Sequence, residues 1–239
     1  MNSYIGLMTR CKDEYFISEF VEYYLSQGID HIYIIDDDSD DKSIYEDLLD
    51  NNKVNIIYGN IEDNYVNEVY GDIKDNYEWI IYVDVDEFIT TRRNNCKTIR
   101  DELSTTFKNV DCIMIPWVMM GCKGIKDSPE RILTSNIYRW SHDKKHPNTI
   151  HKFRCRYEKI EVKCIFKPKL FDAIWDHHPK KPNRSNLRIV NGIDCSDSLL
   201  SSFIDNLREA DIESGFLLCY HYRIISVENC LNKTDRHIT

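Results

Sequence analysis

Residues 79–87, Trp-Ile-Ile-Tyr-Val-Asp-Val-Asp-Glu, form the stretch that decides the fold. Its first five residues are apolar and mostly β-branched or aromatic, which predicts a strand buried on both faces, as in a parallel sheet. Acidic residues follow at once. Because residues i and i+2 of an extended chain point to the same side, Asp84 and Asp86 could meet one divalent cation with their oxygens. The alternative is a solvated turn between strand and loop.

The segments before this strand alternate between strand-like and helix-like patterns. Strands are predicted at residues 4–8, 31–35 and 54–58, and helices at residues 17–25, 43–51 and 66–75. This order predicts an α/β fold with a Rossmann-like, mostly parallel central sheet flanked by helices. Such sheets bind ligands beyond the carboxyl ends of their strands. The acidic residues 36–38 and 84–86 fall at those ends, which is the strongest internal indication of a site.

The second half of the chain is less regular. Strands are predicted at residues 112–118, 151–155, 162–168 and 216–222, and a helix at residues 199–209. We expect both halves to share one core, so that residues 1–239 form a single domain with a soft boundary near Trp117.

The composition limits the classes of protein that the chain could belong to. Its 239 residues are 42% hydrophobic and 30% charged, which indicates a globular protein. The sequence shows no secretory signal and no apolar run of the roughly 18 residues that a membrane span needs, so we expect a soluble, cytoplasmic protein. A net charge of −9 argues against nucleic-acid binding. The nine cysteines include no Cys-x-x-Cys pair, which favours reduced, buried thiols.

Charge is unevenly distributed along the chain. Residues 142–188 contain 13 basic and 5 acidic side chains. This segment could face an anionic ligand or could be a solvated basic surface.

The acidic run at residues 36–41 does not fit an EF-hand calcium loop. Counted from Asp36, the sixth position holds Asp41 instead of glycine and the twelfth holds Asp47 instead of glutamate. Two interpretations remain, a carboxylate that recognises a nucleoside, with Asp37 as the candidate, or a polar turn whose acids cap a helix.

Basic and imidazole side chains complete the set of candidates. Arg10 follows the first predicted strand and could approach a phosphate in the same crevice. His178 and His221 could each complete the shell of a divalent metal. The alternative for both histidines is a hydrogen-bonded structural role beside their aromatic neighbours.

Taken in order, these segments resemble glycosyltransferase family 92 and related family 2-like enzymes. The matching blocks are Arg10-x-x-Asp13-Glu14, residues 20–24, residues 28–33, residues 36–41, residues 79–88, Lys163-Cys164-Ile165-Phe166-Lys167-Pro168, His177-His178, and His221-Tyr222 with Ser226 and Lys233. The resemblance spans nearly the whole chain.

The resemblance implies a GT-A fold and transfer of a sugar from a nucleotide diphosphate donor, usually a UDP-sugar, with Mn²⁺ or Mg²⁺. Residues 1–117 would form the nucleotide-sugar-binding half and residues 118–239 the acceptor-side half. The acceptor could be a glycan, a lipid or a protein.

The resemblance also assigns roles to individual residues. Thr9 and Asp37 would contact the nucleoside, and Asp84 the ribose or the metal. Asp86 would be the principal metal ligand, together with His221 or His178.

Members of the family invert the anomeric carbon, which requires a general base. Asp176 is the candidate, since a carboxylate can take the proton of an acceptor hydroxyl.

Two other functions fit parts of the sequence. A phosphohydrolase of the haloacid dehalogenase type also uses Asp-x-Asp after an apolar strand, but there the motif follows the first strand. A non-catalytic glycan-binding module would need neither metal nor donor.

Overall fold

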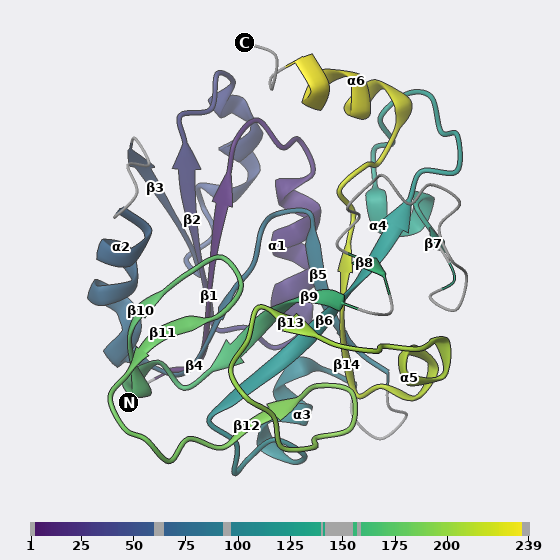
Figure 1. Ribbon diagram of the computed structural model, residues 1–239. Helices are drawn as coiled ribbons and strands as arrows, with labels where there is room; N and C mark the ends of the chain where they lie inside the picture. The colour runs from purple at the N-terminus through teal and green to yellow at the C-terminus, as the bar shows by residue number, and fades with distance from the viewer. Residues whose placement is uncertain are drawn as a thin grey trace.

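The computed structural model describes residues 3–59, 65–92, 97–139, 141, 155–156 and 159–235. Its first half confirms the predicted α/β alternation, with four parallel strands in the spatial order β3-β2-β1-β4 (Figure 1). These strands are β1 (Ser3–Cys11), β2 (His31–Asp37), β3 (Val54–Gly59) and β4 (Tyr77–Tyr82). Because the strands are parallel, their carboxyl ends lie together at one edge of the sheet, here called the carboxyl edge.

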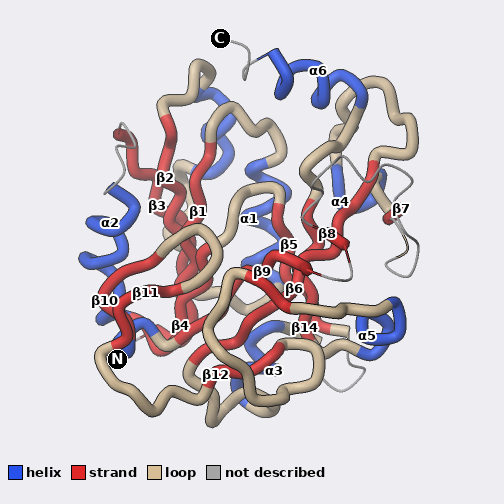
Figure 2. The backbone as a smooth tube through the Cα atoms, viewed as in Figure 1, coloured by secondary structure: helices blue, strands red, loops and turns tan. Residues whose placement is uncertain are grey.

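Helices and a hairpin cover the two faces of this sheet (Figures 1 and 2). Buried residues of α1 (Ile17–Ser26) and α3 (Ile99–Ser104) pack with one face. On the other face, α2 (Tyr65–Ile73) packs with the hairpin of β10 (Phe171–Ile174) and β11 (Pro179–Pro182). Alternate residues of the strands supply the two hydrophobic cores, which explains why strand β4 is apolar at almost every position.

The same sheet continues into the second half of the chain. Antiparallel β9 (Lys159–Phe166) joins β4 to β6 (Cys112–Gly121), and β6 pairs in parallel with β14 (Leu217–His221). Beyond β14 lies antiparallel β5 (Glu87–Thr91). The four strands of the first half and these four thus form one mixed, mostly parallel sheet.

Smaller elements surround this sheet. They are β7 (Tyr138–Arg139), β8 (Cys155–Arg156), β12 (Ile189–Asn191), β13 (Phe203–Ile204), α4 (Ile132–Ser135), α5 (Glu209–Ser214), α6 (Val227–Asp235), and 3₁₀ helices η1 (Lys42–Leu48), η2 (Lys74–Asn76) and η3 (Pro168–Leu170).

The predicted helix at residues 199–209 is wrong. That segment is mostly irregular, and Phe203 and Ile204 pair with β9 as strand β13. Helix α5 begins only at Glu209, where the side chain of Asp211 accepts a hydrogen bond from the backbone N–H of Arg208. The Ser, Asp and Asn side chains of residues 199–208 can hydrogen-bond to the nearby backbone, which competes with the backbone hydrogen bonds of a helix. Pairing of Phe203 and Ile204 with β9 then stabilises a strand instead of a helix.

The helix predicted at residues 43–51 is a 3₁₀ helix, η1, which ends at Leu48. Asp41 caps it by accepting a hydrogen bond from the N–H of Ser43. Most of the strand predicted at residues 151–155 lies outside the described residues. None of the seven cysteines whose side chains the structure describes forms a disulfide. In the described part of the chain, no helix is long and apolar enough to cross a membrane.

Candidate active site

The acidic residues after β4 form a tight turn between β4 and β5. The N–H of Glu87 bonds the carbonyl oxygen of Asp84 at 3.0 Å, and the Glu87 carboxylate accepts the N–H of Asp84 at 2.8 Å. The prediction that Asp84 and Asp86 lie on an extended chain is therefore wrong. These reciprocal bonds bend the backbone, so the two aspartates have different partners.

Asp84 lies between two cations. Its Oδ2 accepts a hydrogen bond from Lys163 Nζ at 3.0 Å, and its Oδ1 lies 3.7 Å from a guanidinium nitrogen of Arg10. Burial and the charge of Asp86 oppose ionisation of Asp84. Lys163 and Arg10 outweigh them and lower the pKa of Asp84, which is therefore ionised at neutral pH.

Arg10 also connects the turn to Asp176. Strand β1 carries Arg10 to the carboxyl edge, and its guanidinium donates to Asp176 Oδ1 at 3.3 Å. Asp176 follows β10, and its side chain is 44% exposed. Burial opposes the charge of Arg10, but Tyr82, Asp84, Asp176 and Asp37 raise the pKa of this guanidinium. The structure thus brings the predicted base and a predicted donor-binding residue into contact.

Asp86 faces His221. His221 Nε2 lies 3.4 Å from Asp86 Oδ1, and the imidazole ring packs at 4.4 Å from the ring of Trp117. Strand pairing sets this contact, because β14 places His221 opposite Glu87 of β5. Burial disfavours the imidazolium, but Asp86 outweighs it and raises the pKa of His221.

Two charged residues beneath the turn were missed by the sequence analysis as site residues. Lys163 is only 1% exposed, and its Nζ lies 3.0 Å from Asp84 Oδ2 and 3.2 Å from Glu87 Oε2. Glu87 is fully buried, and burial raises its pKa to about 7 although Lys163 favours the ionised form. A lysine inside the otherwise apolar pattern of residues 162–166 was the available signal.

The other predicted donor-binding residues lie at or near the same edge. Thr9 is fully buried in β1, and its hydroxyl donates to the carbonyl oxygen of Arg10. Asp37 ends β2, and its charge acts on Arg10. Its neighbour Asp36 is buried and accepts a hydrogen bond from Tyr45, so it is structural. The acidic run therefore combines structural and capping acids with the carboxylate of Asp37.

The two histidines after Asp176 have different surroundings. His178 contacts the carbonyl oxygen of its neighbour Pro179 and the ring of Trp175. His177 Nε2 instead lies 3.7 Å from the buried carboxylate of Glu161. Of the two histidines predicted as metal ligands, His221 is the one whose imidazole faces Asp86.

A divalent ion such as Mn²⁺ or Mg²⁺ needs several ligand atoms close together. Among the described residues, no three Asp, Glu, His or Cys side chains form a group that could enclose a metal ion. Two donors, Asp86 Oδ1 and His221 Nε2, do face each other across 3.4 Å. Such a pair fits an ion that takes its remaining ligands from water and a substrate diphosphate, as Mg²⁺ commonly does.

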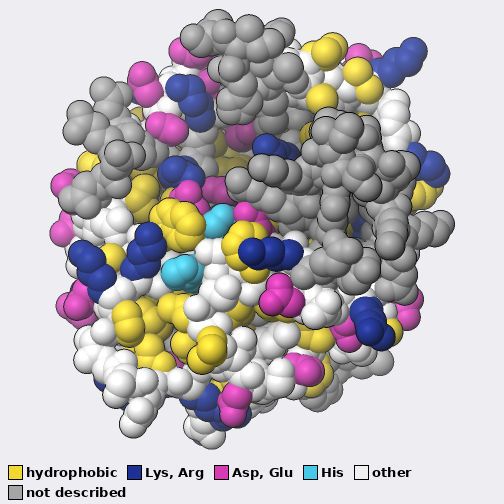
Figure 3. All heavy atoms as spheres, in the orientation of Figure 1, with side chains coloured by type: hydrophobic (Ala, Val, Ile, Leu, Met, Phe, Trp, Pro, Cys, Tyr) yellow, Lys and Arg dark blue, Asp and Glu magenta, His cyan; other side chains and the backbone are white. Residues whose placement is uncertain are grey.

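The surface view shows acidic and histidine side chains close together near the middle of one face, bordered by hydrophobic and basic ones (Figure 3). Trp175, next to Asp176, is 43% exposed. Its backbone N–H bonds the carbonyl oxygen of His178, which closes the tip of the β10–β11 hairpin.

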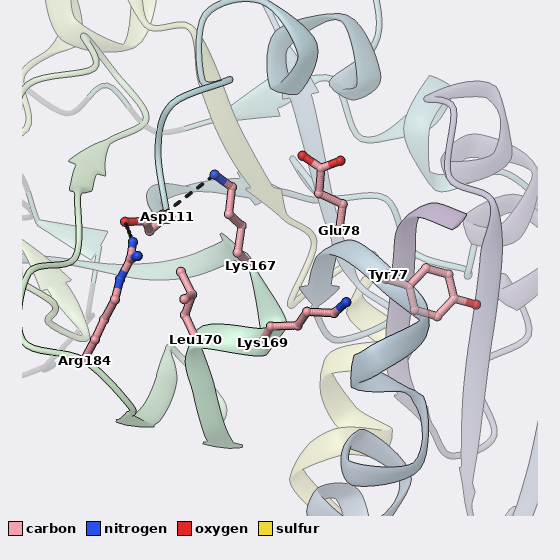
Figure 4. Close-up of a pocket in the computed structure, with 7 residues that line it drawn as sticks. All are labelled: Tyr77, Glu78, Asp111, Lys167, Lys169, Leu170 and Arg184. Carbon is pink, nitrogen blue, oxygen red and sulfur yellow. Dashed lines mark hydrogen bonds and ion pairs between the residues drawn. The ribbon is translucent and has the colours of Figure 1, made fainter. Parts of the chain in front are cut away.

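A separate cavity of about 450 Å³ lies at the opposite edge of the sheet, near the start of β4 (Figure 4). It is lined by Tyr77, Glu78, Asp111, Lys167, Lys169, Leu170 and Arg184. Asp111 pairs with Arg184 at 2.6 Å and with Lys167 at 3.7 Å, so two of the three cations that line the cavity share one carboxylate. This cavity has no acidic turn and is distinct from the candidate site.

Comparison with known proteins gives a family match. The sequence model of glycosyltransferase family 92 matches residues 70–235, which is more than half of the chain. The match includes every residue of the candidate site except Thr9 and Arg10 of β1 and Asp37 of β2. No curated protein matches the sequence.

Solved structures show remote similarity. HddC from Yersinia pseudotuberculosis is 13% identical, with a TM-score of 0.42, over 90% of this chain and 98% of its own. TarS from S. aureus in complex with UDP-GlcNAc is 16% identical, with a TM-score of 0.41, over 70% of this chain and 46% of its own, so this chain spans less than half of it. A 4-diphosphocytidyl-2C-methyl-D-erythritol synthase from Anaerococcus prevotii is 12% identical, with a TM-score of 0.38, over 70% of this chain and 73% of its own.

Proposed function

This chain belongs to glycosyltransferase family 92 and is a glycosyltransferase, and on that basis we propose that it uses a nucleotide diphosphate sugar. The donor we propose is a UDP-sugar, the acceptor group is a hydroxyl, and the transfer inverts the anomeric carbon with the help of Mn²⁺ or Mg²⁺. The observation that carries the proposal is that charged side chains from distant parts of the sequence lie close together at the carboxyl edge. They are Arg10, Asp84, Asp86, Asp176 and His221.

The donor diphosphate brings negative charge to an edge that is already acidic. Asp86 and His221 would hold the divalent ion, which supplies Lewis-acid stabilisation of the departing diphosphate. Arg10 adds a fixed positive charge whose side chain remains 34% exposed, so it can bind a phosphate oxygen directly. Asp37, at the end of β2, is the residue we propose beside the nucleoside. Thr9 is fully buried in β1, so its side chain cannot reach a ligand in this arrangement.

Asp176 is the proposed general base. Arg10 holds its Oδ1, and Oδ2 is the atom that would take the proton of the acceptor hydroxyl. As that proton moves, the acceptor oxygen bonds the anomeric carbon on the face opposite the diphosphate. The bond between that carbon and the diphosphate oxygen breaks, and its electron pair leaves with UDP.

The acceptor side is formed in part by the β10–β11 hairpin, which carries both Trp175 and Asp176. A glycan, a lipid or a protein could supply the hydroxyl group. Membership of a glycosyltransferase family favours sugar transfer over a haloacid dehalogenase-type hydrolysis and over a non-catalytic glycan-binding role.

A thermal-shift screen with nucleotide sugars, each measured with and without Mn²⁺, tests the proposal. A ligand that binds only the native state raises the melting temperature, by an amount that grows with its concentration relative to its Kd. We expect UDP-sugars to do so in the presence of Mn²⁺, and GDP- and CMP-sugars to have smaller effects. No stabilisation by any nucleotide sugar, with hydrolysis of a generic phosphate ester instead, would contradict the proposal.

A further inference from the structure

Lys163 connects the strand β9 to the acidic turn from below. Its ammonium is buried and contacts two carboxylates, Asp84 at 3.0 Å and Glu87 at 3.2 Å. Its Nζ also lies 5.6 Å from the centre of the Tyr82 ring. Because Lys163 is only 1% exposed, it cannot reach a substrate in this arrangement.

Glu87 completes the connection. The same oxygen, Oε2, faces Lys163 and accepts the backbone N–H of Asp84 at 2.8 Å. Lys163 therefore holds Asp84 in two ways, through its carboxylate directly and through its backbone by way of Glu87. A buried ion pair is a poor source of stability, since an apolar pair of similar volume often stabilises a fold as well. Because the buried pair of Lys163 and Glu87 is not needed for stability, its presence points to a role in the site.

The contacts separate the two aspartates of the turn. Lys163 and Arg10 flank Asp84, whereas Asp86 faces His221. Positive charge beside a carboxylate lowers its attraction for a cation. Asp84 is thus held away from metal binding, and in the described part of the chain Asp86 and His221 offer two protein donors.

We propose that Lys163 is a positioning residue that withholds Asp84 from the divalent ion, so that the ion binds firmly only when a nucleotide diphosphate adds its oxygens. This inference rests on the proposed function and adds an ordered dependence of the metal on the donor. The wild-type protein should bind Mn²⁺ weakly by itself and much more strongly with UDP.

A double variant, Lys163→Met with Glu87→Gln, tests this role. It removes the buried cation together with the buried acid, and Asp84, whose side chain is 35% exposed, keeps Arg10. No buried charge is left alone, so the melting temperature should stay near that of the wild type. Lys163→Met by itself should lower the melting temperature markedly, because two carboxylates lose their buried counter-ion. The matched control is Arg100→Met with Asp30→Asn, which removes an ion pair at the opposite edge of the sheet.

Binding of Mn²⁺ is measured by electron paramagnetic resonance of the free ion, without nucleotide and with UDP. With Asp84 released, we expect the double variant to bind Mn²⁺ alone at least tenfold more tightly than the wild type, while UDP strengthens Mn²⁺ binding less. The control variant should show wild-type Mn²⁺ binding.

Two results would overturn the inference. A folded double variant with wild-type Mn²⁺ affinity, beside a wild type that binds UDP with Mn²⁺, would refute the role of Lys163 alone. A wild type that binds no UDP under any metal condition would refute the proposed function and this inference with it.

Discussion

The two edges of the parallel sheet carry similar numbers of charges but arrange them differently. The opposite edge, where the parallel strands begin, is here called the amino edge. There each acid has its own cations: Asp30 pairs with Arg100, and Asp111 with Arg184 and Lys167. At the carboxyl edge the cations are shared.

Among the described residues of the carboxyl edge, Asp84, Asp86, Glu87 and Asp176 gather around two permanent cations, Arg10 and Lys163. At the amino edge, three cations face the two carboxylates, so no excess of negative charge remains there. The carboxyl edge has an excess of carboxylates that a divalent ion could neutralise. The two edges therefore differ in the sign of their excess charge, and the excess of carboxylates supports the carboxyl edge as the candidate site.

The largest expected effect comes from removing Asp86. Asp86→Ala should lower kcat/KM for sugar transfer by on the order of 10³-fold or more, since electrostatic stabilisation of the leaving group is lost. Steady-state kinetics with a UDP-sugar donor measures this, and circular dichroism checks that the variant is folded. A folded variant with unchanged transfer would remove Asp86 from the site.

Replacing Asp176 should lower sugar transfer less than replacing Asp86 does, and the loss should be confined to the rate of the chemical step. Asp176→Asn should lower kcat by about 10²–10⁴-fold, the usual contribution of a general base. The Kd for UDP with Mn²⁺ should stay within about threefold of the wild type, because catalysis and ground-state binding are separable. Near-wild-type turnover would show that another group takes the proton.

Asp30 provides the matched variant at the amino edge. Its carboxylate accepts the backbone N–H groups of Tyr4 and Ile5 and pairs with Arg100. Asp30→Asn should lower the free energy of unfolding by about 1–3 kcal/mol, as for hydrogen bonds to a charged group. Transfer at low temperature should be unchanged, which would separate the roles of the two edges.

The difference in stability between the wild type and Asp30→Asn should also depend on pH. Burial opposes ionisation of Asp30, but Arg100 and the amides of Ile5 and Tyr4 outweigh it and lower its pKa in the folded state. Its contribution to stability is therefore present above the unfolded pKa of about 4 and is lost as the pH falls through the lower folded value. In urea titrations, the gap between wild type and Asp30→Asn should shrink below that pH. A gap that widens in acid would contradict this assignment.

Trp175 should have the smallest effect of the set. It is 43% exposed and lies at the tip of the β10–β11 hairpin, next to Asp176. Trp175→Ala should raise the KM for the acceptor by roughly 5–30-fold, as expected for loss of one aromatic contact worth about 1–2 kcal/mol. The KM for the donor should not change. Equal changes in both would indicate a general distortion of the hairpin.

The sequence predicted the fold well where burial dictates the pattern. Strand β4 is apolar at nearly every position because both of its faces are covered, and the strands around it follow the same rule. The helix at residues 199–209 was wrong because pairing of Phe203 with β9 is a long-range contact that no local pattern contains.

The candidate site shows the same limit. Asp84 and Asp86 were found because they follow a buried strand. The partners of these acids were harder to find, since Lys163 and His221 reach the turn only through the pairing of β9 and β14 with distant strands. Even the turn itself was misjudged, because the hydrogen bond from the N–H of Asp84 to the Glu87 side chain is invisible in a residue pattern.

We propose that the carboxyl edge binds a nucleotide diphosphate through a divalent ion. Calorimetric titration of UDP into the wild-type protein, first with Mn²⁺ and then with a chelator, tests it most directly. We predict that Mn²⁺ strengthens UDP binding by at least about tenfold, or roughly 1.4 kcal/mol. Equal UDP affinity in both titrations, or no binding in either, would contradict metal-dependent binding of the donor at this edge.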